Sequence, residues 1–399
     1  VRAWFYPAAL RMGYSLAVVE RVWDILRSFA SFGFCKAHAA AFALPTFQSA
    51  WLKAHYPAAF YAGILTHDPG MYPKRLILDD ARNHGVRILG LDINHSKAEY
   101  RVERVDDTMG VRLPLSEVKG ISAEEVDTAL SGQPYASLAD AWHRSGLSRP
   151  VLEGLVMAGG FDAMHGFSVR RQAQRRSAIT RRDLLLQLAD LDRLHAPDDC
   201  VAQLTLDLGG EEPVPSGLPE FSPAELVRAE LDILGLDVSH HVMSFHERML
   251  RELGVMRAEA ILGCRSQAEV LVAGVKVATQ TPPIRTGRRV VFLTLDDATG
   301  PVDATFFEDA QGPYANTIFT SWLLLVRGHV RRTGRRGVSI RATGAWELGW
   351  VREQWLSHGG DGVRALLDAD RVVAEEADRR RILVHSSGFR QSPYADVRS

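Results

Sequence analysis

The feature that most constrains the fold is a change of hydrophobic period near residue 269. From Glu269 to Glu347, apolar and polar residues alternate in five segments: VLVAGVKVATQ, RRVVFLTLDD, GPVDATFFED, SWLLLVRGHVRR and GVSIRATGAWEL. Alternation of this kind predicts half-buried β-strands. A short helical pattern at residues 310–317 lies between the third and fourth segments. Most of the preceding chain has the three-and-four spacing that is typical of helices.

Five strands with a helix between the third and the fourth are the order of an OB-fold, a small barrel that often binds nucleic acid. Two loops of this region are rich in arginine, which favours contact with phosphates. The DNA-binding candidates in these loops are Arg285, Arg288, Arg289, Arg331, Arg332, Arg335 and Arg336. Stacking rings for single strands are available in Phe292, Phe306, Phe307 and Trp322. Strand aromatics more often belong to a core, so the arginines rank above the rings.

The net charge of −1 hides an uneven distribution of charge. Between Asp190 and Glu230, ten acidic residues face two arginines, whereas Arg265 to Ala345 holds eleven basic residues against six acidic ones. An acidic connector therefore masks a basic module in the overall sum.

Composition disfavours several classes of protein. The chain is 46% hydrophobic and 24% charged, which is typical of soluble globular domains. It shows no apolar run of ~20 residues and no signal-peptide pattern, so we expect a cytoplasmic protein without a membrane partner. Cys35, Cys200 and Cys264 lie far apart with no CxxC, which argues against a disulfide framework or a zinc ribbon. His240, His241 and His246 lack further ligands at metal spacing, so we expect a structural role and no metal site.

The stretch from Phe29 to Thr66 is almost free of carboxylates and carries Lys36, His38, Lys53 and His55 among small apolar and aromatic residues. Pro45 predicts a kink or a boundary inside its helical pattern. The segments FGFCKAHAAAFAL and QSAWLKAHYPAAFYAGILT closely resemble the fingers domain of bacterial C-family DNA polymerases, the replicative alpha subunits and their error-prone relatives. The resemblance implies that the four basic residues bind the triphosphate of an incoming nucleotide. The alternative is that Lys36 caps a helix and the histidines make structural hydrogen bonds.

Two glycine-containing turns follow. In VRLPLSEVKGISAEEVDTAL, the turn from Val118 to Ser122 lies between two helical patterns and fits a helix-hairpin-helix, in which backbone N–H groups approach a DNA phosphate. Lys119 and Gly120 are the DNA-binding candidates here, and an ordinary helical turn is the alternative. The later LVMAGGFD resembles the family's second hairpin.

An arginine run and a short peptide come next. The run contains Arg170, Arg171, Arg175, Arg176, Arg181 and Arg182, and either a DNA contact or a solvated helix fits it equally well. The first four are retained as DNA-binding candidates.

The peptide comprises Gln203, Leu204, Thr205, Leu206, Asp207 and Leu208 and resembles the QLxLxL/F clamp-binding peptide of bacterial polymerases. Such an extended peptide would place Leu204, Leu206 and Leu208 against a sliding clamp, with Gln203 fixing its orientation.

We therefore predict a multidomain chain, mainly α (fingers part and tandem helix-hairpin-helix), followed by an all-β OB-fold. The expected boundaries are 1–100 for the fingers part, 101–194 for the hairpins, 195–260 for an acidic linker and helical connector, 261–347 for the OB-fold and 348–399 for a tail. The chain begins without methionine inside helical sequence, and we expect a fragment or a truncated gene product. The basic-aromatic ending resembles the error-prone branch.

The resemblance implies the C-terminal part of an error-prone DNA polymerase, used in damage-tolerant synthesis. Its partners would be primer-template DNA, deoxynucleotide triphosphates and either the sliding clamp or an accessory polymerase-like protein. The complete enzyme would use Mg²⁺ held by palm aspartates, but this chain carries none that is recognisable, so we expect no bound cofactor and no polymerisation by it alone. The adjacent pairs Asp79-Asp80, Asp106-Asp107 and Asp296-Asp297 lack the palm pattern. A non-catalytic DNA-binding accessory or scaffold protein is the alternative.

Overall fold

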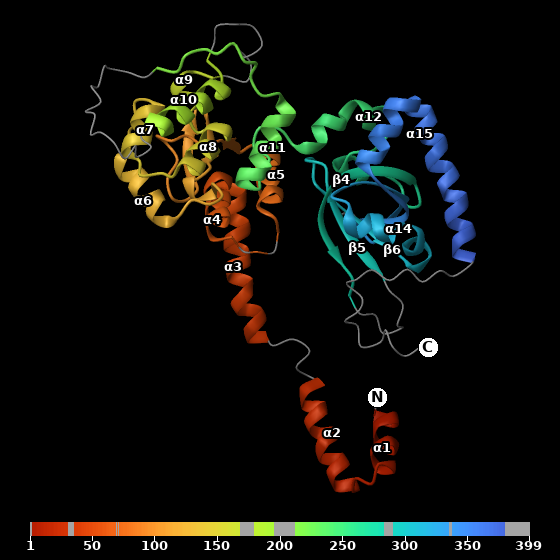
Figure 1. The fold of residues 1–399 in the computed structure, drawn as a ribbon. Helices are drawn as coiled ribbons and strands as arrows, with labels where there is room; N and C mark the ends of the chain where they lie inside the picture. Colours follow the sequence, from red (N-terminus) through yellow and green to blue (C-terminus); the bar gives the residue numbers. More distant parts are fainter. Residues whose placement is uncertain are drawn as a thin grey trace. The chain divides into compact units, whose positions relative to one another are not determined.

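The computed structural model describes residues 2–30, 36–68, 70, 72–167, 179–194, 212–282, 290–334 and 337–379. The chain divides into two compact units, residues 1–60 and residues 61–399, and Figure 1 traces their helices and strands. Among the described helices, none combines the length and the apolar character that crossing a membrane requires.

Three helices make up most of the first unit: α1 (Arg2–Arg11), α2 (Leu16–Ala30) and α3 (Lys36–His55). α1 and α2 meet through aromatic rings, since the Trp23 ring centroid lies 5.6 Å from that of Phe5 and 5.9 Å from that of Tyr6. α3 continues through Pro45, which therefore does not mark a helix boundary. The alanine-rich sequence before this proline favours helix strongly, and that preference outweighs one lost backbone hydrogen bond.

α3 leaves its large apolar side chains uncovered. Phe42, Leu44, Phe47, Trp51 and Leu52 are all exposed. A surface helix of a globular domain normally turns such residues toward a core. The other described residues of the first unit therefore do not bury the apolar surface of α3.

The second unit begins within α4 (Pro57–His67), which packs on α5 (Lys74–Asn83). The hydroxyl of Tyr61 on α4 donates to Asp80 Oδ2 at 2.7 Å. A three-stranded sheet follows, formed by β1 (Arg87–Leu89), β2 (Arg101–Val105) and β3 (Thr108–Arg112). β3 is central, parallel to β1 and antiparallel to β2. The sequence VRILGLDINHSKAEYRVE predicts one short strand and an extended passage, so the sheet has more strands than the local sequence predicts.

The helical region after this sheet is built from short helices. Its elements are the 3-10 turn η1 (Leu115–Glu117), α6 (Ala123–Gly132), α7 (Leu138–Arg144), α8 (Arg149–Met157), α9 (Asp162–His165) and α10 (Arg181–Leu194). α10 packs against α7 and α8, and the buried stripe of Leu184, Leu188 and Leu191 supplies its contact surface. Leu152 and Leu155 are buried on α8. The predicted stripe on α10 is thus the inner face of this helix.

A helical connector joins this region to the barrel. It contains α11 (Pro223–Leu234), the 3-10 turn η2 (Val242–His246), α12 (Glu247–Glu252) and α13 (Ala258–Ile261). α11 begins at a capping box, in which Ser222 Oγ accepts from the Glu225 N–H and the Glu225 carboxylate accepts from the Ser222 N–H. It ends at Gly235, whose φ of +67° is the left-handed conformation that glycine adopts without strain.

The C-terminal part of the second unit is a closed five-stranded barrel, as predicted. Its strands are β4 (Glu269–Gln280), β5 (Val291–Asp296), β6 (Pro301–Phe306), β7 (Leu323–Arg332) and β8 (Val338–Glu347). They close in the order β4-β5-β6-β8-β7, and α14 (Glu308–Thr320) lies between β6 and β7 in the chain. The core includes Val275, Leu293, Phe306, Leu325 and Ile340. The predicted fold class, helices followed by an all-β barrel, is confirmed.

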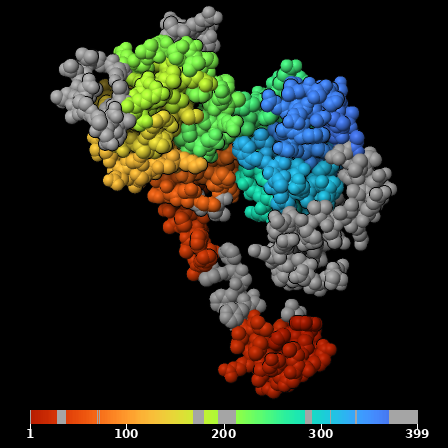
Figure 2. Space-filling view, viewed as in Figure 1, coloured from red at the N-terminus to blue at the C-terminus, as the bar shows by residue number. Residues whose placement is uncertain are grey.

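The segment predicted as a tail begins as a helix. α15 (Leu348–Arg379) packs against β7, β8 and α14, and Figure 2 shows α14 and α15 in blue along one side of the barrel. Gly359 (φ +68°) interrupts its helical backbone. Val351, Val363 and Leu367 are buried in the same core as the strands, so α15 is part of the barrel module.

Candidate nucleic-acid interface

The first hairpin turn has the predicted glycine conformation. Gly120 has φ +87°, and both Gly120 and the side chain of Lys119 are exposed. The Lys119 N–H is occupied, because it donates to the carbonyl of Ile233 on α11 at 2.9 Å. The turn therefore offers a cation and an accessible glycine backbone, while Lys119 also ties it to the connector.

The N-terminus of α6 is already occupied by a carboxylate of the chain itself. Glu125 accepts the Ser122 N–H at 2.8 Å and the Ser148 N–H at 2.9 Å, linking the start of α6 to the start of α8. These two backbone hydrogen bonds lower the pKa of Glu125 to about 2. Because this helix N-terminus already binds a carboxylate, the predicted DNA contact of the turn rests on Lys119 and Gly120 and stays a prediction.

The second hairpin turn is held by an arginine from the predicted run. Gly159 has φ +87°, and the Arg181 guanidinium beside it binds both oxygens of Asp162, at 2.9 and 2.6 Å, and the carbonyl of Met157 at 2.6 Å. Arg182 pairs with Glu225 at 3.2 Å. Both arginines therefore have structural partners. Arg170, Arg171, Arg175 and Arg176 lie outside the described residues, as does the clamp-like peptide of Gln203, Leu204, Leu206 and Leu208.

The four predicted nucleotide-binding residues fall into two pairs at opposite ends of α3. Lys36 and His38 are in its first turn, and Lys53 and His55 are in its last. At 1.5 Å per residue, His38 and Lys53 are about 22 Å apart along the axis. His55 stacks on Trp51 at 4.5 Å, and the exposed His38 lies edge-on to Phe42 at 4.5 Å. One triphosphate cannot contact both ends, so the binding role stays a prediction for each pair separately.

Neighbouring strand positions of the barrel form a row of side chains that is exposed at Phe292, Arg341 and Arg331 and buried at Thr305. Strand register places Phe292 (β5) beside Thr305 (β6), Thr305 beside Arg341 (β8), and Arg341 beside His329 (β7). Phe292 is 42% exposed, and the exposed Arg341 lies over the Phe307 ring at 5.3 Å. The exposed Arg331 is on the same strand as His329 and two residues beyond it. We call Phe292, Thr305, Arg341, His329 and Arg331 the barrel row.

The structure shows which of the predicted barrel residues are buried, which have protein partners and which face outward. Phe306 is fully buried, so it belongs to the core, and Trp322 is exposed but lies under the Arg75 guanidinium at 5.7 Å. Arg332 donates to the carbonyl of Leu262, which leaves Arg331 as the predicted loop arginine that faces outward. Arg285, Arg288, Arg289, Arg335 and Arg336 lie outside the described residues.

Sequence reasoning missed Arg341 and His329. Both sit within strands, whereas the search for positive groups concentrated on the loops. The signal was present in GVSIRATGAWEL, where Ser339, Arg341 and Thr343 alternate with the apolar residues and therefore point to one side of the strand.

Comparisons with known proteins agree with this architecture. The family described as "Helix-hairpin-helix motif" matches residues 85–173, and the family described as "OB-fold nucleic acid binding domain" matches residues 270–348. Among the solved structures, the crystal structure of yeast Stn1 and Ten1 matches at 12% identity, over 30% of this chain and 59% of that chain. The TM-score of this match is 0.17, which is too low to indicate a common fold.

Curated relatives match most of the chain. An error-prone DNA polymerase of Symbiobacterium thermophilum is 33% identical over 356 residues, which cover 79% of this chain and 32% of the relative. Error-prone DNA polymerases of Nocardia farcinica (34% identical, 80% of this chain, 27% of the relative) and Teredinibacter turnerae (29%, 82% and 30%) are similar over a comparable range. This chain spans no more than 32% of the length of these relatives. Over about four fifths of its length, this chain is therefore similar to error-prone DNA polymerases, and the two family models match its helix-hairpin-helix and OB-fold regions.

Proposed function

We propose that this chain supplies nucleic-acid-binding surfaces of an error-prone DNA polymerase, in which it serves damage-tolerant synthesis. The observation that carries the proposal is the barrel row, in which the exposed ring of Phe292 on β5 and the exposed Arg341 on β8 share a register line, with Arg331 two residues beyond this line on β7. Aromatic stacking together with a positive groove is the usual way in which barrels of this class hold an unpaired strand. Lys119 and Gly120 would add a second contact on the duplex side.

The described partners of Asp79, Asp106 and Asp297 support the view that these aspartate pairs do not hold the two metal ions of nucleotide addition. Asp79 pairs with Arg82 at 2.5 Å, Asp106 pairs with Arg87 at 2.9 Å, and Asp297 accepts the Ala258 N–H at 2.9 Å. In the described residues, each adjacent pair thus has protein partners and lies on a different element. A magnesium centre needs carboxylate oxygens that converge on open space. We therefore propose that other polypeptide supplies the catalytic aspartates and that this chain alone does not extend a primer.

Binding to a primer-template with a single-stranded overhang tests the barrel row. Arg331→Ala should weaken binding and lower the slope of log affinity against log salt by about 1, because one phosphate contact is lost. Phe292→Ala should weaken binding to the overhang more than to blunt duplex. Arg228→Ala is the matched control, since Arg228 is an exposed arginine on α11. Equal effects of Arg331→Ala and Arg228→Ala would contradict the assignment.

Primer extension tests the second part of the proposal. The purified chain, supplied with Mg²⁺ and all four deoxynucleotide triphosphates, should leave a labelled primer unextended. Extension that survives further purification would show that the catalytic carboxylates are in this chain. The reading frame upstream of Val1 separates the alternatives, because palm carboxylates encoded in frame favour the polymerase over a free-standing scaffold.

A further inference from the structure

The two hairpin turns share a backbone conformation but differ in exposure. Gly120 in the first turn and Gly159 in the second both have φ +87°, in the left-handed region that favours glycine. Gly120 and its neighbour Lys119 are exposed, whereas Gly159 and its neighbour Gly160 are buried. The same local geometry is therefore presented to solvent at one turn and enclosed at the other.

The space over each glycine shows the difference directly. Apart from the two chain neighbours, a Cβ built on Gly120 would meet no atom of the described residues within 4 Å. A Cβ built on Gly159 would lie 2.7 Å from Nη2 of Arg181 and 3.0 Å from Oδ2 of Asp162. A glycine that lets a phosphate approach needs open space above its backbone. That space is open at the first turn and is filled at the second by side chains of the chain itself.

The backbone N–H groups of the two turns are also used differently. In the second turn, the Gly159 N–H donates to the carbonyl of Val156 at 3.2 Å, and the Gly160 N–H donates to that of Leu155 at 2.7 Å. In the first turn, the Gly120 N–H donates to no other residue of the described chain. A phosphate could therefore accept from Gly120, whereas it would have to displace a hydrogen bond to reach either glycine of the second turn.

Arg181 closes the second turn by binding both of its arms. Its Nη1 donates at 2.6 Å to the carbonyl of Met157, the last residue of α8. Its Nε and Nη2 donate at 2.9 and 2.6 Å to the two oxygens of Asp162, the first residue of α9. The Arg181 side chain is only 9% exposed. One guanidinium thus fixes the end of one helix against the start of the next, and its charge is paired within the protein.

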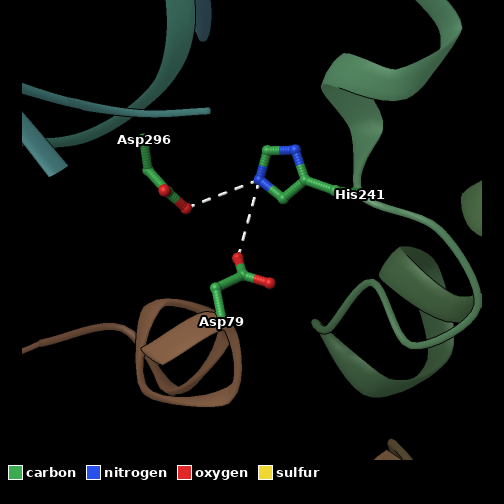
Figure 3. A group of neighbouring side chains, drawn as sticks. All are labelled: Asp79, His241 and Asp296. Atoms are coloured by element: carbon green, nitrogen blue, oxygen red, sulfur yellow. Dashed lines mark ion pairs between the residues drawn. The ribbon is translucent and has the colours of Figure 1, made fainter. Parts of the chain in front are cut away.

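The pair of Arg181 and Asp162 is more direct than another buried ionic group of the second unit. In the cluster of Asp79, His241 and Asp296, which joins α5 to the barrel, the imidazole Nε2 lies 3.6 and 3.4 Å from the two carboxylates (Figure 3). Well-formed N–H···O hydrogen bonds are roughly 2.7–3.2 Å long. The two parallel bonds of Arg181 are no longer than 2.9 Å, and a bidentate pair fixes direction as well as distance. Arg181 therefore holds the second turn in one defined geometry.

Two further segments are attached at the second turn. The Ile93 N–H donates to the carbonyl of Gly160 at 2.8 Å, which ties the turn to the loop after β1. The Arg181 N–H donates to Oε2 of Glu220 at 2.9 Å, which ties the turn to the segment that leads into α11. The second turn is thus a meeting point for segments of the chain, which is the environment of an internal anchor.

We propose that, of the two turns, only the first contacts the DNA backbone, through Lys119 and Gly120, and that the second is an internal anchor closed by Arg181. The hairpin region then holds a duplex by the phosphates next to one turn. This inference rests on the proposed role of Lys119 and Gly120 in DNA binding. It assigns no role to residues 168–178, which lie outside the described residues.

A negative charge placed beside each turn tests this asymmetry. Ala123 is the first residue of α6, directly after the first turn, and Ala163 is the second residue of α9, directly after the second; both are exposed. With the whole chain and a blunt DNA duplex, Ala123→Glu should weaken binding about 2- to 5-fold, because one exposed charge then repels a phosphate. Ala163→Glu should change the affinity by less than about 1.5-fold. Equal weakening by the two variants would overturn the proposal.

The salt dependence of binding separates a phosphate contact from an internal anchor. Lys119→Ala should lower the slope of log affinity against log salt by about 1. Arg181→Gln removes a charge that is paired inside the protein, so it should raise amide hydrogen exchange in residues 157–166 and leave the slope unchanged. A slope lowered by about 1 in Arg181→Gln would place Arg181 on a phosphate and overturn the proposal. If this variant does not fold, the two alanine positions still decide.

The same measurements distinguish failure of this inference from failure of the proposed function. Weakening by Ala163→Glu together with Ala123→Glu and Lys119→Ala would overturn the single-turn contact and leave DNA binding by the hairpin region in place. Unchanged binding in both Lys119→Ala and Ala123→Glu would overturn the proposed contact of the first turn, and this inference with it.

Discussion

The helix α3 exposes its large apolar side chains, whereas the barrel buries them. In the barrel, the large inward side chains such as Phe306 and Leu325 are fully buried, whereas Phe47 on α3 is 70% exposed. The barrel satisfies its own hydrophobic pattern because its strands close on themselves. α3 carries a conspicuous apolar and aromatic sequence that the other described residues of the first unit do not cover. Within this unit, the segment that carries the clearest family resemblance thus adds little buried apolar surface.

The largest effect should come from truncating one aromatic side chain in each region. Phe306→Ala should lower the free energy of opening of the barrel by about 3–5 kcal/mol, because it leaves a cavity in a closed core. Phe47→Ala should change the stability by less than about 0.5 kcal/mol. Amide exchange of the strands measures both. Comparable losses for the two variants would mean that α3 is buried in the chain as it exists in solution.

Glycine substitutions extend the comparison to a tightly packed strand of the barrel and an exposed helix position. A Cβ at Gly328 would overlap the carbonyl oxygen of Arg341, where the β7–β8 register shifts, so Gly328→Ala should destabilise the barrel by about 2 kcal/mol. Gly63 in α4 has open space around it, and Gly63→Ala should stabilise that helix by about 0.5–1 kcal/mol. Thermal unfolding of the two variants should shift in opposite directions. A gain in stability for Gly328→Ala would show that the strand crossing is looser than described.

The third comparison concerns the hairpin region, where a single capping carboxylate at the start of α6 can be tested. Glu125→Gln should cost about 1 kcal/mol at pH 7, because the capping carboxylate is near solvent and its charge is screened. Since the pKa of Glu125 is lowered from 4.5 to about 2, its stabilisation is present above pH 4.5 and is lost as pH falls through about 2. The difference between the two proteins should therefore shrink in acid, as urea unfolding at several pH values would show. A difference independent of pH would assign the effect to side-chain packing.

Local patterns predicted the barrel better than the rest of the second unit. Each of its five strands is at least six residues long and rich in β-branched or other apolar residues, so the local sequence carries a strand signal. β3 was missed because TMGVR is short, contains glycine and pairs in parallel with β1, twenty or more residues earlier. Pairing of that kind leaves no local signal.

The candidate sites show the same difference between features that local sequence predicts and contacts that only the fold creates. Gly120 and its turn were predictable, since a left-handed glycine follows from local sequence. The structural role predicted for His241 fits its burial, but its partners Asp79 and Asp296 lie 162 and 55 positions away and only the fold brings them together. Phe306 and Phe307 are adjacent aromatics with opposite fates, one inside the core and one beside Arg341, because neighbouring residues at the end of a strand face opposite sides.

The hydrogen bond from the Lys119 backbone to Ile233 has a mechanical consequence. Ile233 lies in the last turn of α11, and the chain runs from there directly to the loop that carries His241. A phosphate that pulled Lys119 outward would also pull on the C-terminal end of α11. A displacement of the first hairpin turn would then pass to the end of α11 and to the short loop that leads to η2 and the barrel.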